Sequence, residues 1–167
     1  MTTDDLLALP HRPHWELLGV RDAERFFTAI RSTGWAGTHL FLEGASQPPS
    51  VRRVLQMQST AGPYLPRRQT IWPPPEQWSL SFTDDVLVQL SDLAASHAEP
   101  ELADHLFIYA DDVPLVEWPD AFAPDSPILV SGSVSEQSIY AFAKQVAATV
   151  TWVDGAVQQG HEADETR

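Results

Sequence analysis

Cysteine is absent from the 167 residues of this chain, and lysine occurs only once, at Lys144. Without cysteine the protein forms no disulfide, uses no thiolate in catalysis and holds no zinc or iron–sulfur group through cysteine ligands. A single lysine with no glycine-rich loop before it argues against a P-loop NTPase, a pyridoxal phosphate enzyme and a lysine-dependent nuclease. The eight glycines form none of the phosphate-binding or nucleophile motifs. The chain therefore carries no recognisable catalytic motif, and no cofactor is predicted.

Long apolar runs are also missing. No uninterrupted apolar stretch approaches the roughly 20 residues that span a bilayer. The acidic first residues, Met1 to Asp5, lead into no apolar run of signal-peptide length. We therefore expect a cytoplasmic protein.

Basic side chains are scarce in the second part of the chain. Residues 69–167 carry seventeen of the 23 Asp and Glu residues but only two of the 10 Lys and Arg residues, and the net charge is -13. Such a field repels polyanions and attracts basic surfaces over roughly 8–10 Å in physiological salt. Nucleic acids and anionic membranes are therefore not expected as partners.

Length and composition predict one globular domain. We expect a flexible lead-in over residues 1–13, a single domain over 14–153 and a disordered acidic tail over 154–167. The order of predicted elements favours an α/β or α+β fold, with a mixed sheet of five or six strands and about four helices mainly on one face.

Helices are predicted where apolar residues recur at intervals of three and four behind a capping residue. They are expected to begin after Asp22, near Pro48 and after Thr83, and a fourth opens at a capping box formed by Ser133 and Glu136. Strands are predicted where residues alternate in polarity or apolar residues cluster. The strand segments are 15–20 (or a helical turn), 38–43, an edge strand at 67–72, 105–110, 115–118, 128–131 and 149–153 (or an extension of the last helix). A hairpin is expected at Asp111-Asp112, between 105–110 and 115–118.

Two predicted strands have one aliphatic face and one aromatic–polar face. Because side chains alternate along a strand, Leu40 and Leu42 share one face of the first, as do Leu106 and Ile108 of the second. If the helices pack against the aliphatic faces, the opposite face is a half-open platform for a ligand or partner. Its candidate ligand-binding residues are His39, Phe41, His105, Phe107 and Tyr109. The alternative is a set of ordinary outward residues partly covered by the proline-rich segment.

Glu43 is the best-placed carboxylate, because it ends a predicted strand where open α/β sheets gather ligands. Glu117 and Asp120 are the candidates for a second carboxylate in acid–base chemistry. A chain with 23 acidic residues offers such pairs by chance. The structural alternative is that Glu43 accepts hydrogen bonds from backbone N–H groups near Gly44 and Ser46.

A short stretch carries side chains that suit metal ions, namely those of His97, Glu101, Asp104 and His105. Pro100 interrupts the stretch, and its spacing matches no metal-binding family. A solvated connection between a helix and a strand is therefore the favoured interpretation, and no metal is predicted.

Two of the six tryptophans, Trp72 and Trp78, flank a run of three prolines. Tryptophan is enriched at protein interfaces. We therefore expect these residues to form a lid or an exposed contact patch.

Four segments resemble a group of uncharacterised bacterial proteins of similar length. They are Leu42-Glu43-Gly44, Thr70-Ile71-Trp72-Pro73, residues 97–105 and residues 117–122. The resemblance extends over most of residues 15–145. It implies a single bacterial cytosolic domain and implies no activity.

These features favour a small acidic binding module, in the manner of an immunity, adaptor or inhibitor protein. It would recognise a partner protein, with a basic surface on that partner as the option that the charge favours. The alternative is an enzyme or small-molecule-binding protein that uses Glu43 and the face lined by His and Tyr. An acidic structural subunit is a third option, and a homo-oligomer is left open.

Overall fold

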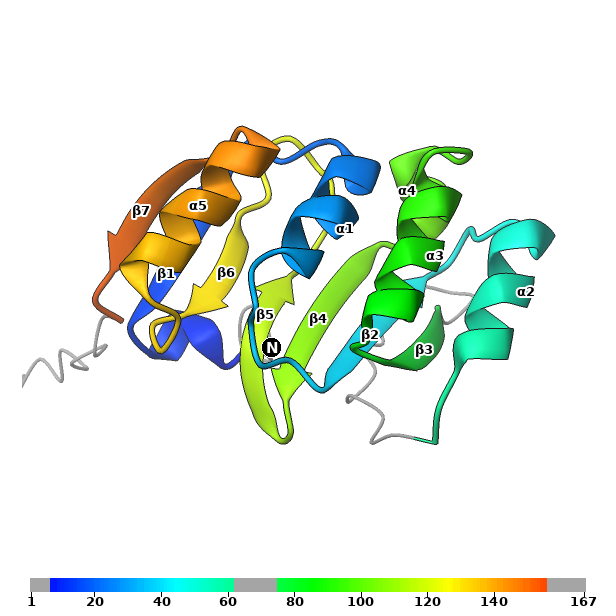
Figure 1. Ribbon diagram of the computed structural model, residues 1–167, viewed down its shortest axis with the longest axis horizontal. Coiled ribbons are helices and arrows are strands. Elements are labelled where there is room, and N and C mark those ends of the chain that lie inside the picture. Colours follow the sequence, from blue (N-terminus) through cyan, green and yellow to red (C-terminus); the bar gives the residue numbers. More distant parts are fainter. Residues whose placement is uncertain (1–6, 62–74, 156–167) are drawn as a thin grey trace, which may run out of the picture.

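The computed structural model describes residues 7–61 and 75–155, and its seven strands form one open sheet in the order β3-β2-β4-β5-β6-β1-β7. Every neighbouring pair of strands is antiparallel. The strands are β1 (His14–Leu18), β2 (His39–Gly44), β3 (Glu76–Ser81), β4 (His105–Ala110), β5 (Val113–Trp118), β6 (Ile128–Ser131) and β7 (Thr149–Val153). The long helices lie on one face of this sheet (Figure 1).

The expected single α+β domain is confirmed, but the expected mixed sheet of five or six strands is wrong. The order of predicted elements, with helices and strands alternating in the first part of the chain, favoured a mixed sheet. The connection through the first helix carries the chain across the sheet, so that the three strands β4, β5 and β6 lie between β1 and β2. β1 is inserted between β6 and β7 and is antiparallel to both.

Three of the described helices begin at a residue whose side chain accepts a hydrogen bond from a first-turn N–H group. The helices are η2 (Leu9–His11, a 3₁₀ turn), α1 (Ala23–Arg31), α2 (Pro49–Gln58), α3 (Asp84–Ala94), α4 (Glu99–Leu102) and α5 (Glu136–Val146). The side chains of Asp22 and Thr83 cap α1 and α3 as predicted. The capping box predicted at Ser133 is wrong, because Ser135 is the N-cap of α5 and accepts the hydrogen bond from Ser138 N–H. No helix among the described residues is long and apolar enough to cross a membrane.

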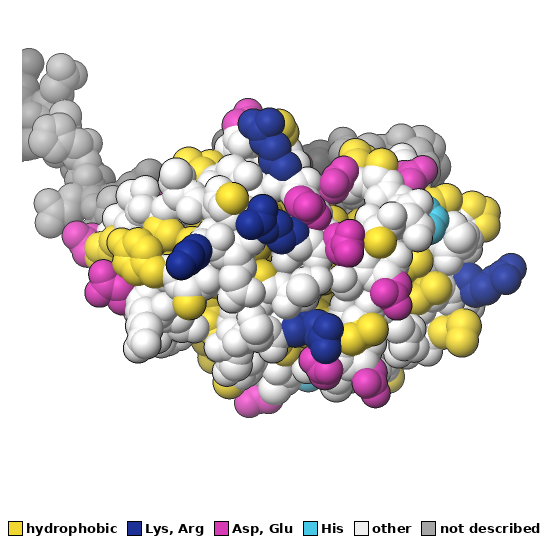
Figure 2. All heavy atoms as spheres, turned by 45° about the horizontal axis from the view of Figure 1, so that its top comes forward, with side chains coloured by type: hydrophobic (Ala, Val, Ile, Leu, Met, Phe, Trp, Pro, Cys, Tyr) yellow, Lys and Arg dark blue, Asp and Glu magenta, His cyan; other side chains and the backbone are white. Residues whose placement is uncertain are grey.

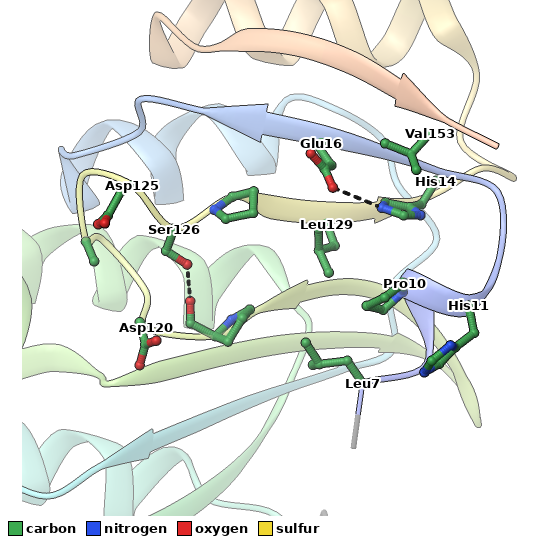
Figure 3. A pocket seen from close by; sticks show the side chains of 13 residues that line it. Leu7, Pro10, His11, His14, Glu16, Asp120, Asp125, Ser126, Leu129 and Val153 are labelled. Carbon is green, nitrogen blue, oxygen red and sulfur yellow. Dashed lines mark hydrogen bonds and ion pairs between the residues drawn. The ribbon is translucent and has the colours of Figure 1, made fainter. Parts of the chain in front are cut away.

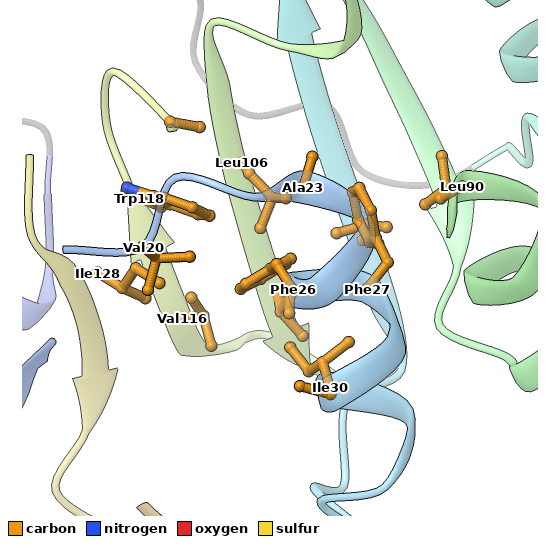
Figure 4. Close-up of a cluster of buried hydrophobic side chains, with 14 of the residues drawn as sticks. Val20, Ala23, Phe26, Phe27, Ile30, Leu90, Leu106, Val116, Trp118 and Ile128 are labelled. Atoms are coloured by element: carbon orange, nitrogen blue, oxygen red, sulfur yellow. The ribbon is translucent and has the colours of Figure 1, made fainter. Parts of the chain in front are cut away.

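The main core lies between the helices and the aliphatic face of the sheet. Leu40, Leu42, Leu106 and Ile108 are all buried there, as the alternation predicts. Side chains from α1 fill the centre, where Phe26 packs against neighbouring aromatic rings (Figure 4). Full burial of a phenylalanine side chain contributes about 1.5–3 kcal/mol. This core therefore fixes the position of the sheet beneath the helices.

The opposite face of the sheet is covered in part by the start of the chain. Leu7 and Leu9 are buried against Phe41, Phe107 and Leu129 in a second hydrophobic cluster. The flexible lead-in expected over residues 1–13 is thus packed from Leu7 onward, because these leucines remove the aromatic face from water. Residues 1–6, the expected edge strand at 67–72 and the expected tail beyond Gly155 lie outside the described residues.

Candidate binding groove

A groove of about 800 Å³ opens on the helix-free face of the sheet. It lies between the η2 turn and the loop that joins β5 to β6, residues 119–127 (Figure 3). Strands β1 and β6 form its floor through His14, Glu16 and Leu129. The lining residues are Leu7, Pro10, His11, His14, Glu16, Pro119, Asp120, Ala123, Asp125, Ser126, Pro127, Leu129 and Val153.

A histidine–glutamate pair forms the polar part of the floor. His14 and Glu16 are two positions apart on β1, so both side chains point away from the helices. His14 is only 2% exposed, and its ring Nδ1 lies 2.7 Å from the carbonyl oxygen of Arg12. Its Nε2 lies 3.4 Å from Glu16 Oε1. The Arg12 carbonyl oxygen accepts a hydrogen bond from Nδ1–H and so fixes the orientation of the His14 ring. In this orientation Nε2 faces the Glu16 carboxylate.

The β5–β6 loop forms one wall of the groove and is held by several hydrogen bonds. Ser126 Oγ donates to the carbonyl oxygen of Pro119 (Figure 3). Asp120 adopts left-handed backbone with φ 47°, which aspartate tolerates better than most residues. Its N–H donates to His105 Nδ1 at 2.9 Å. Nδ1 therefore carries no proton in this arrangement, and it makes no ion pair with the Asp120 carboxylate 3.8 Å away.

Apart from His11 and His14, the ionisable side chains that line the groove are all carboxylic acids. They are Glu16, Asp120 and Asp125. A second hollow of about 390 Å³, lined by residues of the β5–β6 loop and of the segment 99–104, adds Glu99 and Asp104 and shares Asp120. No Lys or Arg of the described chain lines either hollow. On the helix side, by contrast, Lys and Arg side chains lie among Asp and Glu (Figure 2).

Glu117, a predicted catalytic candidate, ties the first residues of the structure to the sheet. It is 2% exposed, and its two carboxylate oxygens accept hydrogen bonds from Ala8 N–H at 2.9 Å and Leu9 N–H at 2.8 Å. Both oxygens thus bind the backbone that forms the η2 wall of the groove. The geometry assigns Glu117 a structural role, whereas Asp120 is exposed in the groove.

Glu43 is buried beside a cavity much smaller than a ligand. Its Oε2 accepts a hydrogen bond from Gln77 Nε2 at 2.9 Å. Among the described residues, no backbone N–H near Gly44 or Ser46 donates to this side chain; Ala45 N–H donates to Asp104 instead. The adjacent cavity measures about 10 Å³, which is room for about one water molecule.

The predicted ligand platform is largely occupied. Phe41 and Phe107 are buried under Leu7 and Leu9. His39, His105 and Tyr109 are half-buried. The ring of His39 stacks on Phe41, and its Nδ1 lies 2.9 Å from Thr38 Oγ1. Only His105 is joined to the groove, through its contact with Asp120.

The four candidate metal ligands have separate structural partners. His97 contacts Ser50 Oγ and the Leu93 carbonyl oxygen, whereas Glu101 accepts from Ala98 N–H. The described residues include no group of three or more His, Asp or Glu side chains arranged to hold a metal ion.

Trp78 is a partner of the core rather than an exposed contact. Its ring packs against the main core, and its Nε1–H donates to Gln47 Oε1 at 2.7 Å. Trp72 lies outside the described residues.

The sequence patterns did not indicate His11, His14, Glu16 or Asp125 as site residues. The alternation of His14, Trp15 and Glu16 does indicate that the two polar side chains lie on the same face of the strand. That β1 lies beside β6, however, depends on the strand order. Comparison of the chain with protein-family models, curated proteins and solved structures finds no match. The chemistry of the groove is therefore the basis for the function proposed below.

Proposed function

We propose that this protein is a binding module whose groove on the helix-free face takes a cationic segment of a partner protein. The occupant would be an extended stretch that carries arginine or lysine side chains. The proposal rests on the charge of the residues that line the groove. Glu16, Asp120 and Asp125 line it, and no Lys or Arg of the described chain does so.

The groove offers both kinds of contact that an arginine or lysine side chain requires. Carboxylates accept charge-assisted hydrogen bonds, and a guanidinium binds one in bidentate geometry. Pro10, Pro127 and Val153, which line the groove and are half-buried, supply an apolar surface for the aliphatic part of such a side chain. A volume of about 800 Å³ suits a few side chains of an extended peptide.

The groove is also held in place before any partner binds. Glu117 fixes the η2 wall, and the Ser126–Pro119 and Asp120–His105 hydrogen bonds fix the opposite wall. A preformed site loses less conformational entropy on binding than a flexible one. The fold thus supports recognition without a large rearrangement.

Small-molecule chemistry at Glu43 receives less support from the geometry. Ligand sites usually enclose about 300–1,000 Å³, far more than the cavity beside Glu43. The carboxylate that would assist it, Glu117, already binds two backbone N–H groups.

A titration followed by NMR tests where a cation binds. The probe is an acetylated and amidated peptide of three Arg-Ala repeats, added to the ¹⁵N-labelled protein in physiological salt. We expect the amide resonances of the non-proline residues in 10–16 and 119–129 to shift first and furthest. Equal shifts along α1 and α3 would show that the peptide only follows the net charge, and this would contradict the proposal.

A further inference from the structure

The two edges of the sheet are protected to different degrees. β3 is accompanied on its outer side by residues 59 and 60, since Ser59 forms a bridge with Leu80 and Thr60 N–H donates to the Ser79 carbonyl oxygen at 2.7 Å. An ion pair of 2.8 Å between Arg52 and Glu76 adds charge at the same edge. β7 pairs with β1 alone, and no other described strand lies beside it.

β7 lacks the features that usually prevent an edge strand from pairing with another sheet. Residues 149–153, Thr-Val-Thr-Trp-Val, include no charge and no proline, and the register with β1 shows no bulge. Trp152 and Tyr140 of the adjacent helix α5 are 41% and 52% exposed. Trp15 contacts both rings, so the two form one aromatic surface. Apolar side chains gather at this end of the molecule in Figure 2.

We propose that a second copy of this chain adds to β7, so that the two sheets join across a two-fold axis that passes between the Thr151 residues of the two copies. Two-fold dimers are the commonest closed assemblies, and an antiparallel pair of identical strands has this symmetry. The axis places Val150 opposite Trp152 of the copy on the helix side, and Thr151 opposite Thr151. The pairing satisfies the outward backbone groups of β7 and covers the exposed indole.

Charge on α5 favours a second copy over an unrelated strand. Glu136 lies in the first turn of α5, and Lys144, the only lysine of the chain, lies in the last turn. A two-fold axis reverses α5 in the copy. Glu136 of each helix then lies toward the Lys144 end of the other, and this complementary contact occurs twice.

Repulsion between the acidic copies is limited by distance. Glu16 neighbours Thr151 in the β1–β7 register, so two Glu16 side chains are three strand spacings apart, about 14 Å. The Debye length in physiological salt is about 8 Å, but it grows to about 30 Å at 0.01 M. The dimer is therefore expected in physiological salt and should weaken at low ionic strength.

Sedimentation velocity of the full chain tests the proposal. We expect wild type at about 100 μM to sediment as a dimer in physiological salt, near the weak end of specific association. Thr151→Lys places two ammonium groups face to face and should yield a monomer, while Met57→Lys, an exposed change on α2 beside the other edge, should leave the dimer intact. Circular dichroism checks that both variants are folded.

A charge exchange provides a second test that does not touch β7. Glu136→Lys and Lys144→Glu should each weaken dimerisation roughly three- to tenfold, because each converts two attractive contacts into repulsive ones. The double variant restores complementarity and should dimerise within about threefold of wild type. A monomeric wild type, a dimer that survives Thr151→Lys, or a double variant weaker than both single variants would overturn the proposal.

Discussion

Glu117 joins the first described residues of the chain, which form one wall of the groove, to the sheet. Its carboxylate accepts two backbone N–H groups that lie more than a hundred positions earlier in the chain. A buried acceptor with two short charge-assisted bonds stabilises more than an ordinary hydrogen bond does. The same bonds hold Leu7 and Leu9 over the aromatic face, so that this one side chain joins the second hydrophobic cluster to the groove.

We expect Glu117→Gln to lower the free energy of unfolding by about 1–3 kcal/mol, because a glutamine amide presents an N–H₂ group to one of the two donors. Glu43→Gln should cost less than about 1 kcal/mol, since its carbonyl can still accept from Gln77. Urea unfolding of both variants measures the difference. Hydrogen exchange should also become faster at Ala8 and Leu9 in Glu117→Gln alone. Equal stability of the two variants would contradict the structural role of Glu117.

At the scale of elements, α1 and α3 are joined by a bidentate ion pair. Arg31 Nε and its terminal nitrogen each lie 2.9 Å from an oxygen of Asp84. The hydrogen bonds from Arg31 are the main cause that lowers the pKa of Asp84 below its ordinary value of 3.8. Because the folded-state pKa is lowered, the contact stabilises the fold above the unfolded-state pKa. That contribution is lost as the pH falls through the folded-state pKa.

Asp84→Asn should therefore destabilise the protein near neutral pH and have a smaller effect at about pH 2, because protonation of the wild-type carboxyl as the pH falls through its lowered pKa removes the contact. Both side chains are exposed to solvent, so added salt should reduce the effect. The measurement is urea unfolding at the two pH values. Asp85→Asn is the control, since Asp85 occupies the same first turn of α3. A pH dependence no larger in Asp84→Asn than in the control would contradict this account.

Local sequence patterns predicted those elements whose ends are marked by capping residues and whose buried face is marked by regularly spaced apolar residues. α1 was predicted because Asp22 caps a stripe of apolar residues, and the structure buries that stripe. α4 was missed because Pro100 suggested a break, although proline is favourable in the first turn of a helix. β3 was missed because its polar sequence, next to three prolines, makes a poor strand on its own. Pairing with β2 along six residues determines it instead.

The groove could not be predicted in the same way. It combines residues 7–16 with residues 119–129, which lie together only because β1 is inserted next to β6. That order is decided by which apolar faces are buried together, and a local pattern does not encode it. The aromatic face was correctly expected to lie opposite the helices. The expected opening was wrong for Phe41 and Phe107, since two leucines outside the predicted domain cover them.

For the molecule as a whole, charge is expected to act at two ranges. The net charge of -13 attracts a basic partner from a distance, chiefly by raising the association rate, and this attraction falls with ionic strength. In the proposed function, short-range hydrogen bonds in the groove would then select the partner. The two contributions are separable, because removing a distant carboxylate weakens only the first whereas removing one in the groove weakens both.

The most direct test is isothermal titration calorimetry with the peptide of three Arg-Ala repeats, in physiological salt. Glu16→Gln combined with Asp125→Asn removes two charges from the groove. Glu24→Gln combined with Asp92→Asn removes two exposed charges from α1 and α3, and so matches the change in net charge. We predict that the groove variant binds about tenfold or more weakly, as expected for lost charge-assisted hydrogen bonds, and that the control changes the affinity by less than about twofold. Equal weakening of the two variants, or no weakening of the groove variant, would contradict the assignment of the groove as the binding site.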